Sequence, residues 1–250
     1  MACCNRNPAI SLLQAYTVFM KHIPFLFFLL FFASLSSTAQ DAGILAQKVK
    51  AKLATVNDYT ATGVMKTDIS FIKVPQSDVI VYYKKPNRFR IKKQDGISIT
   101  PKGGVSVNLN SLFAGDNYTA VFAGNTSING LPVTIVKLLP LDENSDVVVS
   151  TLYIDEKEFL IRKASTTTKD NGTYQMEMSY GKFAQWGLPD KVVFIFSTKD
   201  YKLPKGLAFD YDAGGTKPVD KKLPQDGKGK VEISYSSYTI NKGLSETVFN

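Results

Sequence analysis

The side chains that most often catalyse hydrolysis or bind zinc are nearly absent from this chain. Its 250 residues include one histidine, His22, and two cysteines, Cys3 and Cys4, and all three precede residue 40. A Ser-His-Asp or Cys-His centre needs a histidine base, and structural zinc is bound mainly by cysteine and histidine. Neither kind of site can be built after residue 40, which excludes most hydrolase mechanisms.

Carboxylates are the remaining candidates for catalysis or metal binding. A carboxylate pair can hydrolyse a glycoside without a cofactor, but the acids here fall mostly in turns, such as Asp142-Glu143 and Asp155-Glu156. Asp210 and Asp212 alternate before a glycine, as at the start of a calcium loop, but the third ligand and the distal glutamate are missing. We therefore expect solvated turns, with no metal and no cofactor.

An apolar stripe between residues 174 and 180 is more informative. Tyr174, Met176, Met178 and Tyr180 alternate with polar residues, which predicts a strand with one aromatic and thioether face. Ordinary core packing would explain a single strand of this kind. Methionine also adapts to apolar ligands of variable shape, so the lining of a ligand cavity is the second interpretation.

The stretch Asp78–Asp95 repeats this alternation around a turn at Pro86-Asn87. Five of its odd positions are apolar, namely Val79, Val81, Tyr83, Phe89 and Ile91, whereas its even positions include four cations: Lys84, Arg88, Arg90 and Lys92. Proline fixes φ and has no N–H, so it belongs in the turn and not within a strand. We predict a hairpin with one apolar and one cationic face.

Together the two stretches predict a large concave apolar surface. The residues expected to line a cavity are Val81, Tyr83, Phe89, Ile91, Tyr174, Met176, Met178, Tyr180 and Phe194. One amphipathic helix is expected at 41–56, with Asp41 as its N-cap and Leu45, Val49 and Leu53 on its apolar face. A single such helix cannot cover this surface.

The rest of the chain has strand patterns and hairpin-like links, such as Asp170-Asn171-Gly172. Because no helices alternate with the strands, we expect a mainly β domain with an antiparallel sheet. Besides the hairpin, strands are predicted at 59–72, 97–100, 119–122, 133–139, 147–154, 159–168, 173–183, 191–197 and 231–240. The segment 101–117 has the composition for a short helix, and 198–230 is expected to be a long loop set.

The first 39 residues are expected to be a signal peptide. Lys21-His22 precedes an apolar run of 13 residues, Ile23–Leu35, and Ser37-Thr38-Ala39 fits a cleavage site. A membrane-spanning helix needs about 20 apolar residues. Met20 is an alternative start, which would leave 1–19 as an extension. We expect a periplasmic protein, cleaved near Ala39, with 40–250 forming a single domain.

The charge balance does not favour nucleic-acid binding. Without the basic residues Arg6 and Lys21, 28 basic residues face 22 acidic ones. The cations are spread along the chain and not gathered in one block, so a solvated basic surface is expected. The two cysteines precede the apolar run, so neither can be a lipidated residue after it, and we expect a soluble protein without a lipid anchor.

The turn Lys84-Lys85-Pro86-Asn87-Arg88-Phe89 resembles that of the LolA/LolB superfamily of outer-membrane lipoprotein carriers. In that family a strand runs into a K-R-P-N-x-F turn and returns. The resemblance implies an incomplete barrel whose strongly curved sheet encloses an apolar cavity, closed by an N-terminal helix and short lid helices. Lys85 stands where the family has an arginine that contacts the lid, and lysine lacks the planar fork of that arginine.

Three functions remain open at this point. The resemblance implies a monomeric, non-enzymatic carrier of lipoprotein acyl chains or other lipids, served by an inner-membrane release complex and an outer-membrane receptor. The same fold could instead be a lipid-sensing or protein-interaction module of the cell envelope. The third function is an enzyme that uses carboxylates alone, which turnover without any cofactor would reveal.

Overall fold

The computed structural model describes residues 37–69, 72–73, 76–93, 98–99, 109–113, 117–170, 172–197 and 227–249. Residues 42–250 form one compact unit and residues 1–41 a second. The fold and the site described below belong to residues 42–250. None of the helices in the described ranges has the length and apolar character that a membrane crossing requires.

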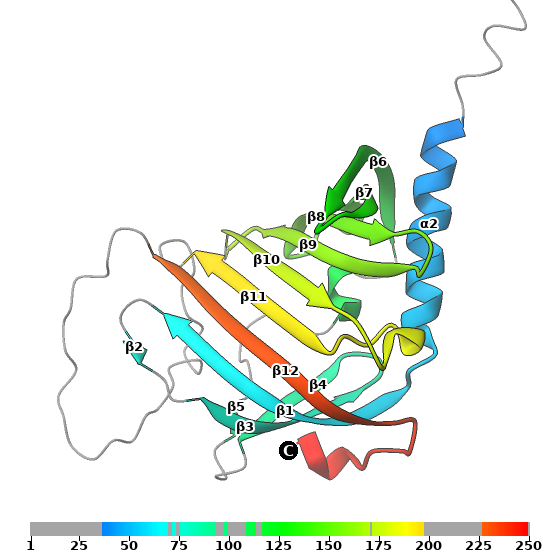
Figure 1. Ribbon diagram of the computed structural model, residues 1–250. Coiled ribbons are helices and arrows are strands. Elements are labelled where there is room, and N and C mark those ends of the chain that lie inside the picture. Colours follow the sequence, from blue (N-terminus) through cyan, green and yellow to red (C-terminus); the bar gives the residue numbers. More distant parts are fainter. Residues whose placement is uncertain are drawn as a thin grey trace, which may run out of the picture. The chain divides into compact units, whose positions relative to one another are not determined.

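The described strands form one antiparallel sheet, visible as the curved layer in Figure 1. Their order across the sheet is β5-β4-β3-β1-β12-β11-β10-β9-β8-β7-β6, with the short β2 beside β1. The strands are β1 (Asp58–Ile69), β2 (Ile72–Lys73), β3 (Ser77–Lys84), β4 (Arg88–Lys93), β5 (Ser98–Ile99), β6 (Tyr118–Ile128), β7 (Leu131–Pro140), β8 (Val147–Asp155), β9 (Leu160–Thr168), β10 (Gly172–Ser179), β11 (Lys191–Ser197) and β12 (Lys228–Ile240).

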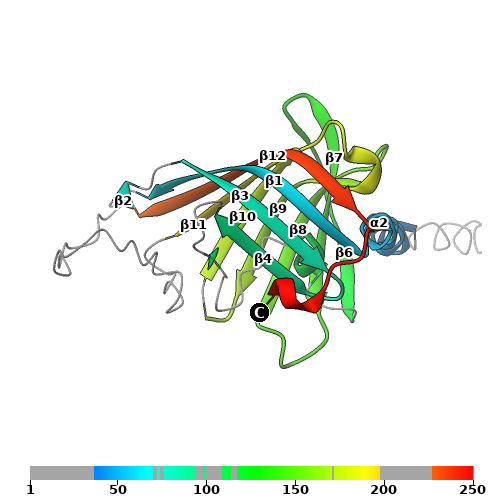
Figure 2. The same cartoon turned by 90° about the horizontal axis from the view of Figure 1, so that it is seen from below.

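Two meanders make up this sheet. One runs from β1 through β3 and β4 to β5, the other from β6 to β12, and the pairing of β1 with β12 joins them. Gly63 lies at a bulge in this pairing, where an added Cβ would lie 2.4 Å from the carbonyl oxygen of Ser234. A bulge increases local twist and bend, which suits a strongly curved sheet (Figure 2).

The expected incomplete barrel is confirmed. β5 and β6 end the order of strands, and no pairing among the described strands closes the sheet between them. Short helices accompany it: η1 (Leu109–Phe113), η2 (Ala184–Trp186) and η3 (Glu246–Phe249). The short helix predicted within 101–117 is confirmed by η1.

The main helix, α2, spans Ser37–Ala54. The predicted N-cap, Asp41, is therefore wrong, because the helix begins four residues earlier and Asp41 lies within it. Apolar spacing locates the buried face of a helix but not its first residue. Leu45, Val49 and Leu53 are all buried, as predicted.

Two strand boundaries differ from the predictions in an informative way. The strand predicted at 173–183 ends at Ser179, because the chain turns at Gly181 and forms η2. The first strand, predicted to reach residue 72, ends at Ile69, and β2 then pairs back onto it. Most of the predicted loop 198–230, including Asp210 and Asp212, lies outside the described residues, although β12 already begins at Lys228.

Candidate functional site

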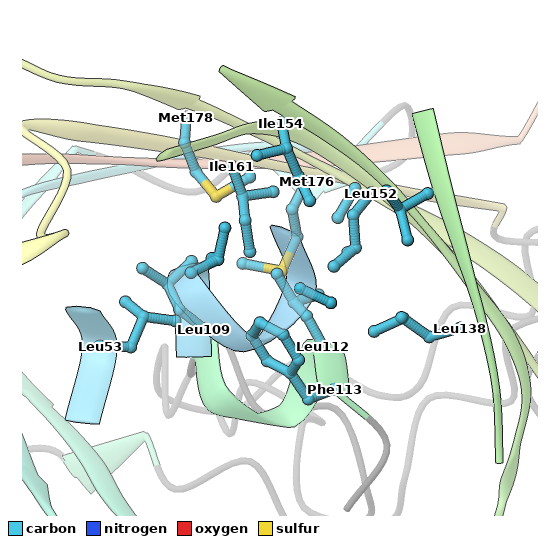
Figure 3. Close-up of a cluster of buried hydrophobic side chains, with 14 of the residues drawn as sticks. Leu53, Leu109, Leu112, Phe113, Leu138, Leu152, Ile154, Ile161, Met176 and Met178 are labelled. Carbon is cyan, nitrogen blue, oxygen red and sulfur yellow. The ribbon is translucent and has the colours of Figure 1, made fainter. Parts of the chain in front are cut away.

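The concave face of the sheet is covered by a cluster of apolar side chains, here called the α2 cluster. Leu45, Val49 and Leu53 of α2, with Leu112 and Phe113 of η1, pack in it against inward side chains of β7–β11. In Figure 3 Met176 and Met178 point from the sheet toward these helical residues. A helical layer therefore fills the hollow of the sheet.

A second cluster, here called the hairpin cluster, lies on the same face under β1, β3 and β4. Its buried members include Val56, Tyr59, Val81, Tyr83 and Ile91. Hydrophobic burial of this kind stabilises the fold by about 25 cal/mol per Å² of apolar surface. The two clusters together give the unit a continuous apolar interior.

A small cavity of about 20 Å³ lies in this interior, next to the last turn of α2. Such a volume admits about one water molecule, so this cavity is too small for a larger ligand in this conformation. The lining residues are Leu53, Val56, Tyr59, Tyr83, Leu109, Asn110, Leu188, Pro189, Val192, Tyr235 and Tyr238.

The nine residues predicted to line a ligand cavity are divided between the two clusters. Tyr174, Met176, Met178 and Phe194 are buried in the α2 cluster, with Tyr180 packed against it. The hairpin cluster holds the others: Val81, Tyr83, Ile91 and the partly buried Phe89. Of the nine, Tyr83 lines this cavity. Met178 is paired in register with Val192, which is another lining residue. Their role in ligand binding remains a prediction.

Sequence reasoning missed the tyrosines that make up much of the cavity wall. Tyr59 lies 5.3 Å from both Tyr83 and Tyr238, measured between ring centroids, and Tyr235 lies 5.0 Å from Tyr238. The Tyr238 hydroxyl donates to the carbonyl of Pro189 at 2.8 Å. Tyr59 and Tyr238 come from the first and last strands, and no local pattern reveals that these strands pair.

These tyrosines remain neutral inside the protein. Burial raises the pKa of Tyr59 well above its usual 10.0, and the neighbouring Tyr235 and Tyr83 raise it further. Burial also raises the pKa of Tyr235 and of Tyr238. The cavity wall is thus uncharged. Tyrosine rings and aliphatic side chains form its apolar part, and tyrosine hydroxyls and the Asn110 amide form its polar part.

Alkaline pH should therefore destabilise the fold. Above pH 10.0 the exposed tyrosines of the unfolded state lose protons that the buried ones keep, so stability present below pH 10.0 is lost as the pH rises. Each tyrosine of this kind lowers the free energy of unfolding by about 1.4 kcal/mol per pH unit in this range. Urea unfolding at increasing pH should show Tyr59→Phe with a shallower decline than wild type, whereas Tyr153→Phe on the outer face should match wild type. Equal slopes for all three would contradict this account.

Polar contacts fasten the C-terminal end of α2 to the sheet. The Lys85 ammonium, in the β3–β4 turn, donates to the carbonyl of Ala54 and, at 3.2 Å, to Asn57 Oδ1. Asn241, just after β12, donates from Nδ2 to the carbonyl of Thr55 at 2.9 Å and accepts from the Asn57 N–H at 2.7 Å. We call these contacts the α2 anchor.

The α2 anchor is one of several polar contacts along α2. A cation near the last carbonyls of a helix is favourable, typically by about 0.3–1 kcal/mol. Lys52, in the last turn, also donates to the Glu158 carbonyl at 2.6 Å, and non-directional apolar packing holds the buried face of the helix. Lys85 thus contacts the end of α2, and whether it controls opening remains a prediction.

No metal centre is evident in the described part of the chain. No three His, Cys, Asp or Glu side chains there are grouped so as to hold a metal ion. Asp155 is a structural carboxylate: Arg162 binds it at 2.7 Å, the Lys157 and Glu158 N–H groups donate to it, and these bonds keep its pKa low against the opposing effect of burial.

Comparison with solved structures identifies the fold. No protein-family model and no curated protein matches the sequence. An outer membrane lipoprotein-sorting protein domain from Vibrio parahaemolyticus matches with a TM-score of 0.55 and 13% identity, over 85% of this chain and 97% of that one.

Two further structures give the same result. A DUF1329 family protein from Desulfovibrio piger matches with a TM-score of 0.56 and 14% identity, over 86% of this chain and 98% of that one. A LolA superfamily protein from Nitrosomonas europaea matches with a TM-score of 0.51 and 13% identity, over 82% and 97%. The chain therefore has a LolA-like fold, as the hairpin motif implied.

Proposed function

We propose that this protein is a non-enzymatic carrier that binds acyl chains, of lipoproteins or of other lipids, between the concave face of the sheet and the helices α2 and η1. The observation that carries this proposal is the α2 cluster. Leucines and Phe113 from the two helical elements α2 and η1 occupy the hollow of the sheet, and their side chains are apolar, as the methylenes of a lipid are.

The small cavity next to the last turn of α2 suggests a route for binding. Because only about 20 Å³ is free there, an acyl chain that enters at this point would have to displace α2 or η1 from the sheet. Each buried CH₂ contributes about 0.8 kcal/mol, so a long chain can offset the exposure of the few leucines and Phe113 that leave. The ligand-binding state is then an open form, and the closed form protects the interior while the carrier is empty.

We further propose that the carrier acts in the periplasm after removal of residues 1–39. The sorting role named for the Vibrio domain supports cargo released at the inner membrane and received at the outer membrane. A release complex and a receptor would then be its partners. The hydrophobic run at 23–35, followed by small residues, supports export.

A fluorescent fatty-acid probe tests the carrier function directly. Titration of the purified protein from Gln40 onward should give saturable binding with one or a few sites and a blue-shifted, enhanced emission, because the probe enters an apolar interior. Excess unlabelled fatty acid should compete. Emission that never saturates, or that competitor does not reduce, would contradict an acyl-chain site.

The sheet edge favours a second candidate function, a lipid-sensing or protein-interaction module. β6 ends the sheet, and no described strand pairs with its outer side. Val121, Phe122 and Leu139 near this edge are each about 40% exposed, and exposed strand edges can accept a strand from another chain. Recovery of a stoichiometric protein partner, with or without bound lipid, would favour this function.

A further inference from the structure

The outer face of the β3–β4 hairpin carries a row of cations opposite its buried apolar face. The register pairs Lys84 with Arg88, Tyr82 with Arg90, and Ile80 with Lys92. Because side chains alternate between faces, these residues point away from the buried Val81, Tyr83 and Ile91. The sheet thus presents four cations beside the half-buried Ile80 and Tyr82.

The C-terminal segment Leu244–Phe249 lies on this cationic face (Figure 2). Glu246 forms ion pairs of 2.8 Å with both Lys84 and Arg88, and Lys84 also donates to the Leu244 carbonyl at 2.8 Å. Arg90 donates to the Val248 carbonyl at 2.7 Å, and Arg88 lies over the Phe249 ring. The face therefore already binds a carboxylate and carbonyl oxygens, supplied by the chain itself.

This cover is easy to replace. The Glu246 side chain is 58% exposed and that of Arg88 50%, and exposed ion pairs hold weakly. Lys84 and Arg88 lower the pKa of the Glu246 carboxyl by hydrogen bonding to it, so it is ionised at neutral pH. On this face the four cations are accompanied by two acids, Asp78 and Glu246, so positive charge is in excess. Asp58, beside Lys84, accepts hydrogen bonds from the Lys242 and Gly243 N–H groups.

We propose that the outer face of the β3–β4 hairpin docks on anionic phospholipid headgroups at a membrane surface, in exchange for segment Leu244–Phe249. This rests on the proposed function, because a lipid carrier must meet membranes to load and unload. The cations are spread over two strands, which fits a field of phosphates better than one carboxylate. Clusters of Lys and Arg are attracted to anionic membrane surfaces.

Vesicle co-sedimentation of the chain from Gln40 onward tests this proposal. Binding should require phosphatidylglycerol in phosphatidylcholine vesicles and should weaken with added salt. Arg88→Gln and Lys92→Gln should each weaken binding about fivefold, whereas Lys137→Gln on the outer face of β7 should match wild type. Glu246→Gln should strengthen binding, because it weakens the competing segment.

Three results would overturn the proposal: equal binding to vesicles without phosphatidylglycerol, equal losses for Lys137→Gln and Arg88→Gln, or no gain from Glu246→Gln. The proposal would also be overturned if the Glu246→Gln protein bound a synthetic peptide of residues 243–249 and did not bind anionic vesicles. That result would assign the face to an acidic protein segment. Because the fatty-acid titration does not use this face, probe binding without vesicle binding would refute the docking surface alone.

Discussion

Met178→Glu is expected to abolish binding of the fatty-acid probe and to lower the free energy of unfolding by about 3–5 kcal/mol. Met178 is 4% exposed, packs in the α2 cluster and is paired with Val192, which lines the cavity. The members of that cluster are apolar, so an introduced carboxylate would have no cationic partner among them. It would either remain charged at high cost or take up a proton. Probe titration and urea unfolding measure the two effects.

The neighbouring residue on the same strand supplies the matched control. The Glu177 side chain is 49% exposed and faces Lys163 at 3.9 Å on the opposite face, so Glu177→Gln should leave both binding and stability near wild type. Met178→Gln separates loss of binding from loss of folding, because it is polar but uncharged and of similar length. If Glu177→Gln and Met178→Gln reduced probe affinity equally, the assignment of the two faces would be wrong.

Lys85→Met is expected to speed both uptake and release of the probe by about fivefold, since a cation at a helix C-terminus is worth up to about 1 kcal/mol. Methionine keeps the apolar stem but cannot donate to the Ala54 carbonyl or to Asn57 Oδ1, as Lys85 does. Stopped-flow mixing with the probe measures both rates. Lys85→Arg should slow release, because a guanidinium has more donors in a fixed plane.

Lys137→Met is the control for Lys85→Met, because Lys137 is an exposed lysine of β7 that points away from the concave face, where α2 packs. Its rates should equal those of wild type. Unchanged rates in Lys85→Met and in Lys85→Arg would mean that the contact with Ala54 does not control opening. The proposed carrier function would survive that result, but α2 would need a different hinge.

Local alternation of side chains allowed most of the sheet to be predicted. The hairpin at Pro86, the strand at 191–197 and the inward face of Tyr174, Met176 and Met178 all follow from a period of two, which local sequence contains. The apolar face of α2 follows from helical spacing in the same way. The start of α2 did not, because its first turn has no apolar pattern to fix it.

Contacts between distant segments could not be predicted from one sequence. The pairing of β1 with β12 brings Tyr59 and Tyr238 together, and it depends on the whole meander lying between them. The cationic face of the hairpin was predicted, but not that Glu246 and Phe249 cover it. Such contacts join residues more than 150 positions apart, and no local pattern encodes them.

Native mass spectrometry of the protein purified from the cell envelope of the organism that encodes it tests the carrier function most directly. The account predicts a population with added mass equal to a lipid or an acylated protein, released when the protein unfolds, and a Met178→Glu copy without that addition. A wild-type protein that carries no acylated molecule, and that takes up none from a mixture of lipids and lipoproteins, would contradict it.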